Sequence, residues 1–82
     1  MNHPHEHYLK NIIVPMIKSP EHLDIVYAID GIGGLLTVNM TKSDMGIVIG
    51  KGGEVIRAIR RVVRQYGMAH NEILSVKINE PS

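Results

Sequence analysis

The chain has 82 residues, no cysteine and a formal net charge of +1, and 44% of its residues are apolar. This length allows one domain of modest stability, and the lack of cysteine excludes disulfide bonds, thiolate metal sites and cysteine nucleophiles. No apolar run reaches the roughly 18 to 20 residues of a membrane span, and the polar start lacks the order of a signal peptide. We therefore expect a single domain over residues 1–82, located in the cytoplasm.

The first predicted element is a helix from Pro4 to about Ile17. Proline is favoured at the first helical position after a polar cap, and apolar residues recur at helical spacing from Leu9 onward. Pro15 removes a hydrogen bond and clashes with the preceding turn, so it predicts a kink or an early end of this helix.

Two short β-rich segments follow, over residues 23–29 and 35–40, joined by the glycine-rich link 30–34. A link of this length between two such segments predicts a hairpin with a bulged or open loop. In the second segment, Leu36, Val38 and Met40 share one face. That face is expected to cover a core, while the other face meets solvent.

A short helix is then predicted from Lys42 to Ile49. Thr41 and, three residues later, Asp44 resemble a capping box in which Asp replaces the usual Glu. Gly50, directly after the helix, is the expected stop signal.

A second helix is predicted from Gly53 to Tyr66 with Gly67 as its stop, and residues 72–78 alternate as a third strand. The element order is therefore α-β-β-α-α-β. Strands joined through helices normally run parallel, with a right-handed crossover. We predict an α+β fold in which helices pack on one face of a three-stranded mixed sheet.

Positive charge is concentrated in one part of the chain. Residues 42–64 carry six basic residues against two acidic ones, a net charge of +4, while the rest of the chain sums to −3. The basic residues are Lys42, Lys51, Arg57, Arg60, Arg61 and Arg64. Such clustering indicates a polyanion partner, although a solvated helix face gives the same pattern.

The link Gly50-Lys51-Gly52-Gly53 places three glycines beside a lysine. It precedes the second helix, where free N–H groups and the helix dipole attract anions, and glycine lets an anion approach the backbone closely. A sharp turn between two helices would need two of these glycines without any ligand. Such a turn does not explain Gly52 beside Lys51, so we interpret the loop as a phosphate-binding site.

The second helix separates into two faces at about 100° per residue. The apolar arc, which we expect to pack, contains Val55, Ile56, Ile59, Val62, Val63 and Tyr66. The opposite arc, which we expect to face outward, contains Arg57, Arg60, Arg61 and Arg64.

Other glycine motifs fail on spacing. A Walker loop needs four residues between its first glycine and Gly-Lys, followed by Ser or Thr, whereas Gly46 and Gly50 enclose three and Gly52 follows Lys51. A dinucleotide fingerprint from Gly50 would require glycine where Val55 stands. We therefore expect no nucleotide cofactor.

The run from Val48 to Ile56, VIGKGGEVI, resembles the VIGxxGxxI signature of the KH RNA-binding domain. The predicted element order is similar to the type II, prokaryotic form of that domain. Within it, the chain most resembles the small stand-alone bacterial KH proteins of the KhpA (YlqC-like) family, over about residues 8–79. The resemblance implies binding of single-stranded RNA, or of single-stranded DNA, in post-transcriptional regulation.

The resemblance also assigns roles to residues. The loop Gly50–Gly53 would clamp the sugar-phosphate backbone of about four unpaired nucleotides. An apolar cleft between the two helices and the third strand would hold the bases. The residues expected to line or support this cleft are Gly46, Ile47 and Ile49. The further residues expected to bind RNA are Arg57, Arg60 and Arg61.

A protein-interaction module is the alternative function. Residues Ile12, Ile13, Met16 and Ile17, or the edge of the hairpin, would then contact another subunit. Small KH proteins of this type self-associate or pair with a larger KH partner, so a homodimer or such a heterodimer is compatible with RNA binding.

The chain ends are expected to be flexible, at residues 1–7 and 80–82, around an ordered core at 8–79. The start contains His3, His5 and His7. We interpret them as a frayed polar start, because a metal site would need further ligands and only Glu6 is near. No nucleophile stands with a histidine and an orienting acid at recognisable spacing, so we expect no enzyme.

Overall fold

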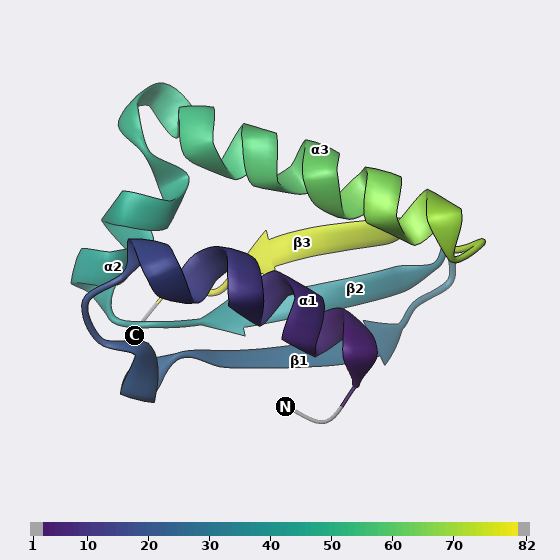
Figure 1. The fold of residues 1–82 in the computed structure, drawn as a ribbon, viewed down its shortest axis with the longest axis horizontal. Coiled ribbons are helices and arrows are strands. Elements are labelled where there is room, and N and C mark those ends of the chain that lie inside the picture. Colours follow the sequence, from purple (N-terminus) through teal and green to yellow (C-terminus); the bar gives the residue numbers. More distant parts are fainter. Residues whose placement is uncertain (1–2, 81–82) are drawn as a thin grey trace.

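Three strands form one mixed sheet in the computed structural model, which describes residues 3–80 (Figure 1). The strands are β1 (Asp24–Ile29), β2 (Gly34–Asn39) and β3 (Leu74–Ile78). The middle strand, β2, is antiparallel to β1 and parallel to β3, with Leu36 opposite Tyr27 on one side and Val76 on the other. The mixed sheet predicted from the helical crossover is thereby confirmed.

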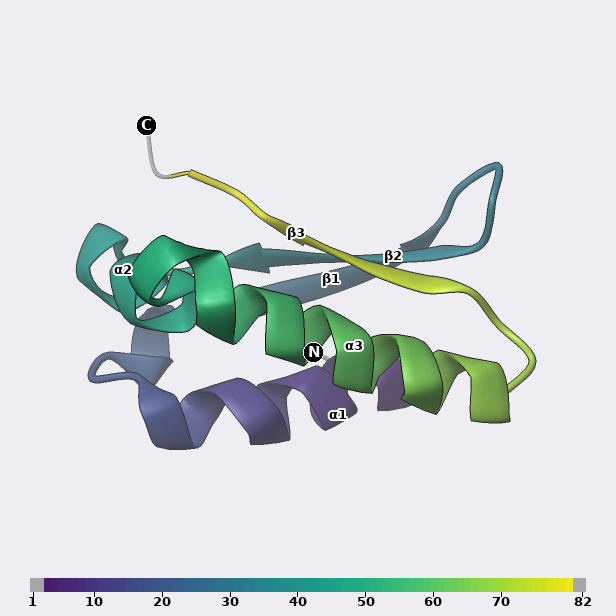
Figure 2. The same cartoon turned by 90° about the horizontal axis from the view of Figure 1, so that it is seen from above.

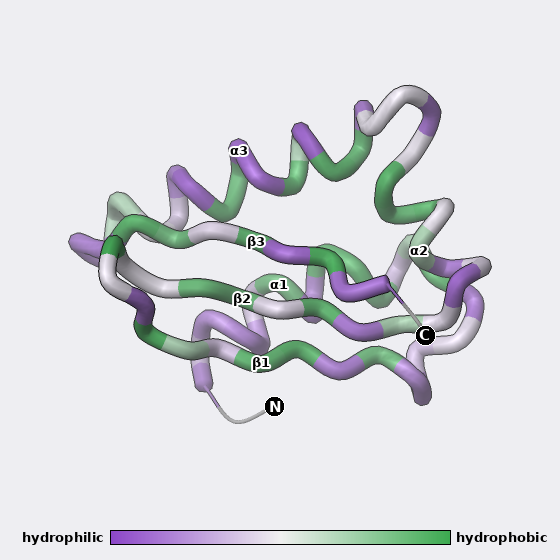
Figure 3. Tube along the Cα trace, turned by 180° about the vertical axis from the view of Figure 1, so that it is seen from behind, coloured by the Kyte–Doolittle hydropathy of each residue, from purple (hydrophilic) through white to green (hydrophobic). Residues whose placement is uncertain are grey.

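The helices are α1 (Pro4–Ile13), α2 (Lys42–Ile49) and α3 (Glu54–Ala69). Figure 2 shows α1 and α3 on one side of the sheet, and Figure 3 views the molecule from the opposite side, where the strands lie uncovered. The α+β fold and the order α-β-β-α-α-β are confirmed. In the part of the chain that the structure describes, no helix is long and apolar enough to cross a membrane.

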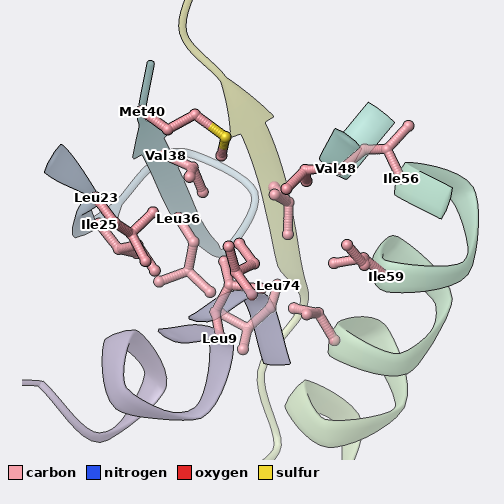
Figure 4. Packing of buried hydrophobic residues seen from close by; sticks show 13 residues of the cluster. Leu9, Leu23, Ile25, Leu36, Val38, Met40, Val48, Ile56, Ile59 and Leu74 are labelled. Atoms are coloured by element: carbon pink, nitrogen blue, oxygen red, sulfur yellow. The ribbon is translucent and has the colours of Figure 1, made fainter. Parts of the chain in front are cut away.

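An apolar core fills the space between the sheet and the helices (Figure 4). Its buried members are Leu9, Ile13, Leu23, Ile25, Leu36, Val38, Met40, Val48, Ile56, Ile59, Val63, Leu74 and Val76. Along β2 the alternation predicts which side chains enter this core, because successive residues of a strand point to opposite faces. Leu36 and Val38 are fully buried, whereas Leu35 and Thr37 are partly exposed.

Helix α1 ends before Pro15, as predicted. Residues Val14–Met16 form a separate 3₁₀ turn that contains the proline. At the other end, the His3 side chain accepts a hydrogen bond from the His5 N–H, and the Glu6 carboxylate accepts one from the His3 N–H. This reciprocal pair is a capping box that fixes the start of α1.

Residues 3–7 belong to the segment 1–7 that was expected to be flexible, and they contain the start of α1. His5 is buried, with Nδ1 2.9 Å from the Tyr66 hydroxyl and Nε2 3.1 Å from a Glu72 carboxylate oxygen. The Tyr66 ring also stacks on Tyr8, with ring centroids 3.8 Å apart. The start of α1 is therefore held against the end of α3. Residues 1–2 and 81–82, also expected to be flexible, lie outside the described residues.

Gly67 lies inside α3, so its prediction as a stop signal is wrong. A Cβ at this position would lie 2.7 Å from the Glu72 carbonyl oxygen and 2.9 Å from Leu74 Cγ. Glycine is therefore required by the close approach of α3 to the segment that enters β3. The chain turns back through Asn71, whose φ of 59° is one that Asn tolerates better than most residues.

Asp44 is fully buried and connects α2 to the segment after α1. Its N–H donates to Thr41 Oγ1 at 3.1 Å, which confirms the predicted cap. Its carboxylate does not complete a capping box but accepts the backbone N–H groups of Lys18 at 3.0 Å and Ser19 at 2.9 Å. The Lys18 N–H is the main cause that holds the pKa of Asp44 below its ordinary value of 3.8.

Candidate nucleic-acid interface

The loop Gly50–Gly53 joins α2 to α3 through a 3₁₀ turn at Lys51–Gly53. Gly50, Gly52 and Gly53 all have positive φ, at 76°, 62° and 77°. These values favour glycine because a Cβ makes the left-handed region costly. A sharp turn was expected to need only two of these glycines, whereas the backbone conformation accounts for all three.

The space around the glycines differs from one position to the next. A Cβ at Gly50 would lie 2.4 Å from Val55 Cγ2, so this glycine is enclosed by the start of α3. A Cβ at Gly52 would meet nothing within 4 Å. The backbone at Gly52 is therefore open to solvent, next to the exposed side chain of Lys51.

Hydrogen bonds inside the loop fix its shape. The Gly53 N–H donates to the Gly50 carbonyl at 3.1 Å, and the Glu54 N–H donates to the Lys51 carbonyl. These two amides are engaged, which corrects the expectation that the N–H groups opening the second helix are all free. Arg57 adds a third bond, from Nη1 to the Gly52 carbonyl oxygen at 2.8 Å.

Helix α3 buries one face and exposes the other, as its periodicity predicts. Ile56, Ile59 and Val63 are buried in the core. Val62 was assigned to the same arc but is 47% exposed, because it lies at the margin of the packed face. The side chains on the opposite, exposed face include Arg57, Arg60, Arg61 and Arg64.

A groove of about 500 Å³ runs between the exposed face of α3 and strand β3. In Figure 1, α3 extends alongside β3, which is an outer strand of the sheet. The residues that line the groove are Arg57, Arg60, Arg61 and Arg64 from α3, and Leu74, Ser75 and Val76 from β3. Because Arg57 also contacts Gly52, the groove begins at the glycine loop.

The arginines bring uncompensated positive charge to this groove. Among residues 3–80, none of them forms an ion pair. Arg60 Nε donates to the Val76 carbonyl oxygen at 3.3 Å, which places this guanidinium across the groove against β3. Positive charge without acidic partners in a concave site attracts and holds a polyanion.

Comparison with protein families matches residues 6–78 to the family described as "KhpA/KhpB, KH domain". The chain belongs to this family. Two relatives, each named "RNA-binding protein KhpA", come from Listeria monocytogenes serovar 1/2a and Listeria innocua serovar 6a. Each is 32% identical over 77 residues, which cover 92% of this chain and 99% of the relative. The KhpA/KhpB family consists of KH domains and not of enzymes, as expected from the sequence.

The resemblance to the KhpA/KhpB family also predicted that three residues of α2 line or support the cleft for the bases. Gly46 is exposed, and Ile47 and Ile49 are partly buried. Ile49 packs against the core. None of the three lines the arginine groove.

The third strand was expected to form an apolar cleft with both helices, whereas the groove that the structure shows lies between β3 and the arginines of α3 alone. None of the three β3 residues, Leu74, Ser75 and Val76, was named as a binding residue, because none of them carries a charge. The only available signal was indirect, because the crossover places the third strand next to the second and leaves one of its edges open.

Two of the three histidines at the start of this KhpA/KhpB-family chain, His3 and His5, serve the fold. His5 and the Tyr27 hydroxyl both hydrogen-bond the Glu72 carboxylate, and the Tyr27 hydroxyl is the larger cause that lowers the pKa of Glu72. Within the described residues, no group of three His, Cys, Asp or Glu side chains is placed to hold a metal ion.

Proposed function

We propose that the chain binds single-stranded RNA at the loop Gly50–Gly53 and acts in post-transcriptional regulation in the cytoplasm. The observation that carries the proposal is the open backbone at Gly52 beside the exposed Lys51. A phosphate can approach Gly52 from the side where a Cβ would stand, because nothing lies within 4 Å of that point, and the lysine adds a positive charge. The positive end of the α3 dipole favours the same anion.

The surroundings of the loop support binding of a nucleic-acid strand more than of a lone anion. Before the loop, Gly46, Ile47 and Ile49 of α2 offer small or apolar surface to bases. After the loop, Arg57, Arg60 and Arg61 of α3 offer positive charge to phosphates; all three arginines are exposed. KH domains hold about four backbone nucleotides at such a glycine loop.

The names of the two Listeria relatives favour RNA over other polyanions. The geometry at Gly52 does not by itself distinguish RNA from single-stranded DNA, because both carry the same phosphodiester. Parallel titrations with an unpaired RNA and the DNA of equal sequence distinguish them.

The test replaces Lys51 and Gly52 together with Asp, and compares this variant with the Lys51→Asn/Gly52→Asn control. Asp and Asn both tolerate the φ of 62° at position 52, so the two variants carry similar backbone strain and differ in charge. We expect the Asp variant to bind a short unpaired RNA at least about tenfold more weakly than the Asn variant, because each of its carboxylates repels phosphate. Circular dichroism checks that both variants fold. A folded Asp variant that binds as tightly as the parent would overturn the proposal.

A protein-interaction module is the second candidate, and one observation favours it. Ile29 and Ile32, at the β1–β2 hairpin, are 78% and 81% exposed. The other expected site, at the end of α1 and just after it, offers less apolar surface. Ile13 is fully buried and Ile12 and Ile17 are partly buried, although Met16 is 37% exposed.

An assembly through the hairpin would be a homodimer or a heterodimer with a larger KH-containing protein. Replacing Ile29 and Ile32 with Ser should then abolish assembly in sedimentation velocity while RNA binding persists. The Lys51→Asp/Gly52→Asp variant should behave in the opposite way. An Ile29→Ser/Ile32→Ser variant that assembles like the parent would contradict this candidate.

A further inference from the structure

Strand β1 is an outer strand of the sheet that residues 3–80 form, with no further strand at one of its edges. The Asp30 N–H donates to the Gly33 carbonyl oxygen at 2.7 Å and so points toward β2. Backbone groups alternate in direction along an antiparallel pair of strands. The N–H and C=O groups of Ile25, Tyr27 and Ile29 are therefore directed toward the open edge.

The residues along this edge have the composition of a strand that pairs readily with another chain. Residues 25–29, IVYAI, carry no charge and no proline, and the side chain of Ile29 is exposed. An outer strand of this kind presents unpaired N–H and C=O groups as a template, and proteins protect such edges with charged side chains or a covering helix. We therefore expect a neighbouring element to protect β1.

The Glu6 carboxylate occupies the middle of the β1 edge. One of its oxygens accepts the Tyr27 N–H at 2.8 Å, and the other accepts the His3 N–H at 3.2 Å. Residues 3–8, here named the edge cover, thus lie against β1 (Figure 1). The carboxylate takes the place that a carbonyl oxygen of a further strand would need, because both would accept the same N–H.

Polar and aromatic contacts hold the edge cover in this place. His5 lies within hydrogen-bond distance of Tyr66 and Glu72, and the Tyr8 ring stacks on Tyr66. The fully buried apolar side chains of α1 begin only after the edge cover, at Leu9. Detachment of the edge cover would leave the apolar core in place, which is typical of a segment that opens locally.

We propose that Glu6 closes the β1 edge, and that release of the edge cover lets β1 pair antiparallel with β1 of a second copy of this chain. An antiparallel edge is self-complementary, because the same row of donors and acceptors meets itself across a two-fold axis. The pairing uses backbone groups and is therefore distinct from a contact through the side chains of Ile29 and Ile32. It does not depend on RNA binding at the glycine loop.

The experiment opens the edge with Glu6→Ala, which removes the acceptor of the Tyr27 N–H. In dilute protein this N–H should exchange with solvent at least about tenfold faster than in the parent, because it loses a hydrogen bond to a charged group. In concentrated protein the exchange should slow again, and sedimentation velocity should show a species of twice the parent's mass. The control is Glu21→Ala, which removes an exposed carboxylate beside His22 and should match the parent in both measurements.

A second substitution distinguishes edge pairing from association through side chains. In the Glu6→Ala background, Ile29→Pro removes an N–H that faces the open edge, a position at which an outer strand tolerates proline. Ile29→Ser removes the same apolar side chain but keeps the N–H. Pairing should be lost with Pro and persist with Ser. Loss in both variants would assign the association to the side chain, persistence in both would assign it to another surface, and either result would refute the proposal.

The Glu6→Gln variant keeps the test decisive if Glu6→Ala does not fold. Gln at this position suits a capping box, but it offers a single acceptor oxygen in place of the two that His3 and Tyr27 use. We expect the same dependence on concentration with a smaller amplitude, and circular dichroism checks the fold. A folded variant at position 6 whose Tyr27 exchange and mass equal those of the parent at every concentration would rule out the closed edge.

Discussion

Arg57 is hydrogen-bonded to the loop that precedes α3, because its Nη1 donates to the Gly52 carbonyl oxygen at 2.8 Å. The bond spans the open position of the loop, so the guanidinium stabilises the loop conformation as well as adding charge. A planar guanidinium and a lysine ammonium are not equivalent in such a contact.

We therefore predict that Arg57→Lys loosens the loop although it keeps the charge. Amide hydrogen exchange at Gly53, whose N–H is bonded inside the turn, should become a few-fold faster. RNA affinity should fall by up to about fivefold, as expected for one exposed hydrogen bond to a charged group. Arg61→Lys is the control, since among the described residues Arg61 forms no hydrogen bond to the loop. Unchanged exchange at Gly53 in the Arg57→Lys variant would contradict this role.

Two helical glycines should respond in opposite ways to replacement by Ala. At Gly67 the new Cβ would be 2.7 Å from a backbone carbonyl oxygen that cannot easily move. Gly67→Ala should lower the free energy of unfolding by about 1 to 3 kcal/mol, as overpacking commonly does. At Gly46 the Cβ would meet nothing within 4 Å, so Gly46→Ala should stabilise the protein by about 0.5 to 1 kcal/mol. Urea unfolding measures both, and equal effects at the two positions would refute the packing explanation.

The buried carboxylate of Asp44 should be required for stability. Asp44→Ala leaves the N–H groups of Lys18 and Ser19 without their acceptor. The loss of unfolding free energy at neutral pH should be about 1 to 3 kcal/mol, the usual cost of unsatisfied polar groups. Asp24→Ala, which removes an exposed carboxylate on β1, should change stability by less than about 0.5 kcal/mol. Similar losses in the two variants would argue against the role of Asp44.

The same carboxylate should make stability depend on pH. Because the pKa of Asp44 is lowered in the folded protein, its contribution is complete above the ordinary value of 3.8 and is lost as pH falls through the lowered pKa. The pKa of Glu72 is lowered as well, from 4.5, so it adds to the loss on the acid side. Unfolding by denaturant at pH 7 and below pH 4 should show a smaller decrease for Asp44→Ala than for the parent. A parent whose stability is constant down to pH 3 would be inconsistent with this assignment.

Binding of a strand of four nucleotides at the loop should be strongly salt-dependent. Each neutralised phosphate on a single strand contributes about −0.7 to the slope of log affinity against log salt. With roughly three to four phosphates engaged, the slope should be about −2 to −3. Titrations at several salt concentrations measure it, and an affinity independent of salt would exclude a phosphate clamp.

Local pattern in the sequence determined the elements, the packed face of α3 and the position of the glycine loop. Alternation in β2 and the helical spacing of Ile56, Ile59 and Val63 report which face of an element is buried, because side-chain direction follows directly from backbone geometry. The loop motif could be located for the same reason, since Gly50, Lys51, Gly52 and Gly53 are contiguous in the chain.

Tertiary structure alone decided which distant groups meet. His5 with Tyr66 and Asp44 with Lys18 are pairs that lie 61 and 26 positions apart. Periodicity identifies the buried face of an element but not the segment that packs against it. Gly67 was therefore predicted to end the helix, whereas it lies inside α3 where the helix packs closely against the segment that enters β3. The groove is the clearest case. The four arginines were visible in the sequence, but their opposite wall exists only because the parallel crossover lays β3 beside α3, with one edge of that strand left unpaired.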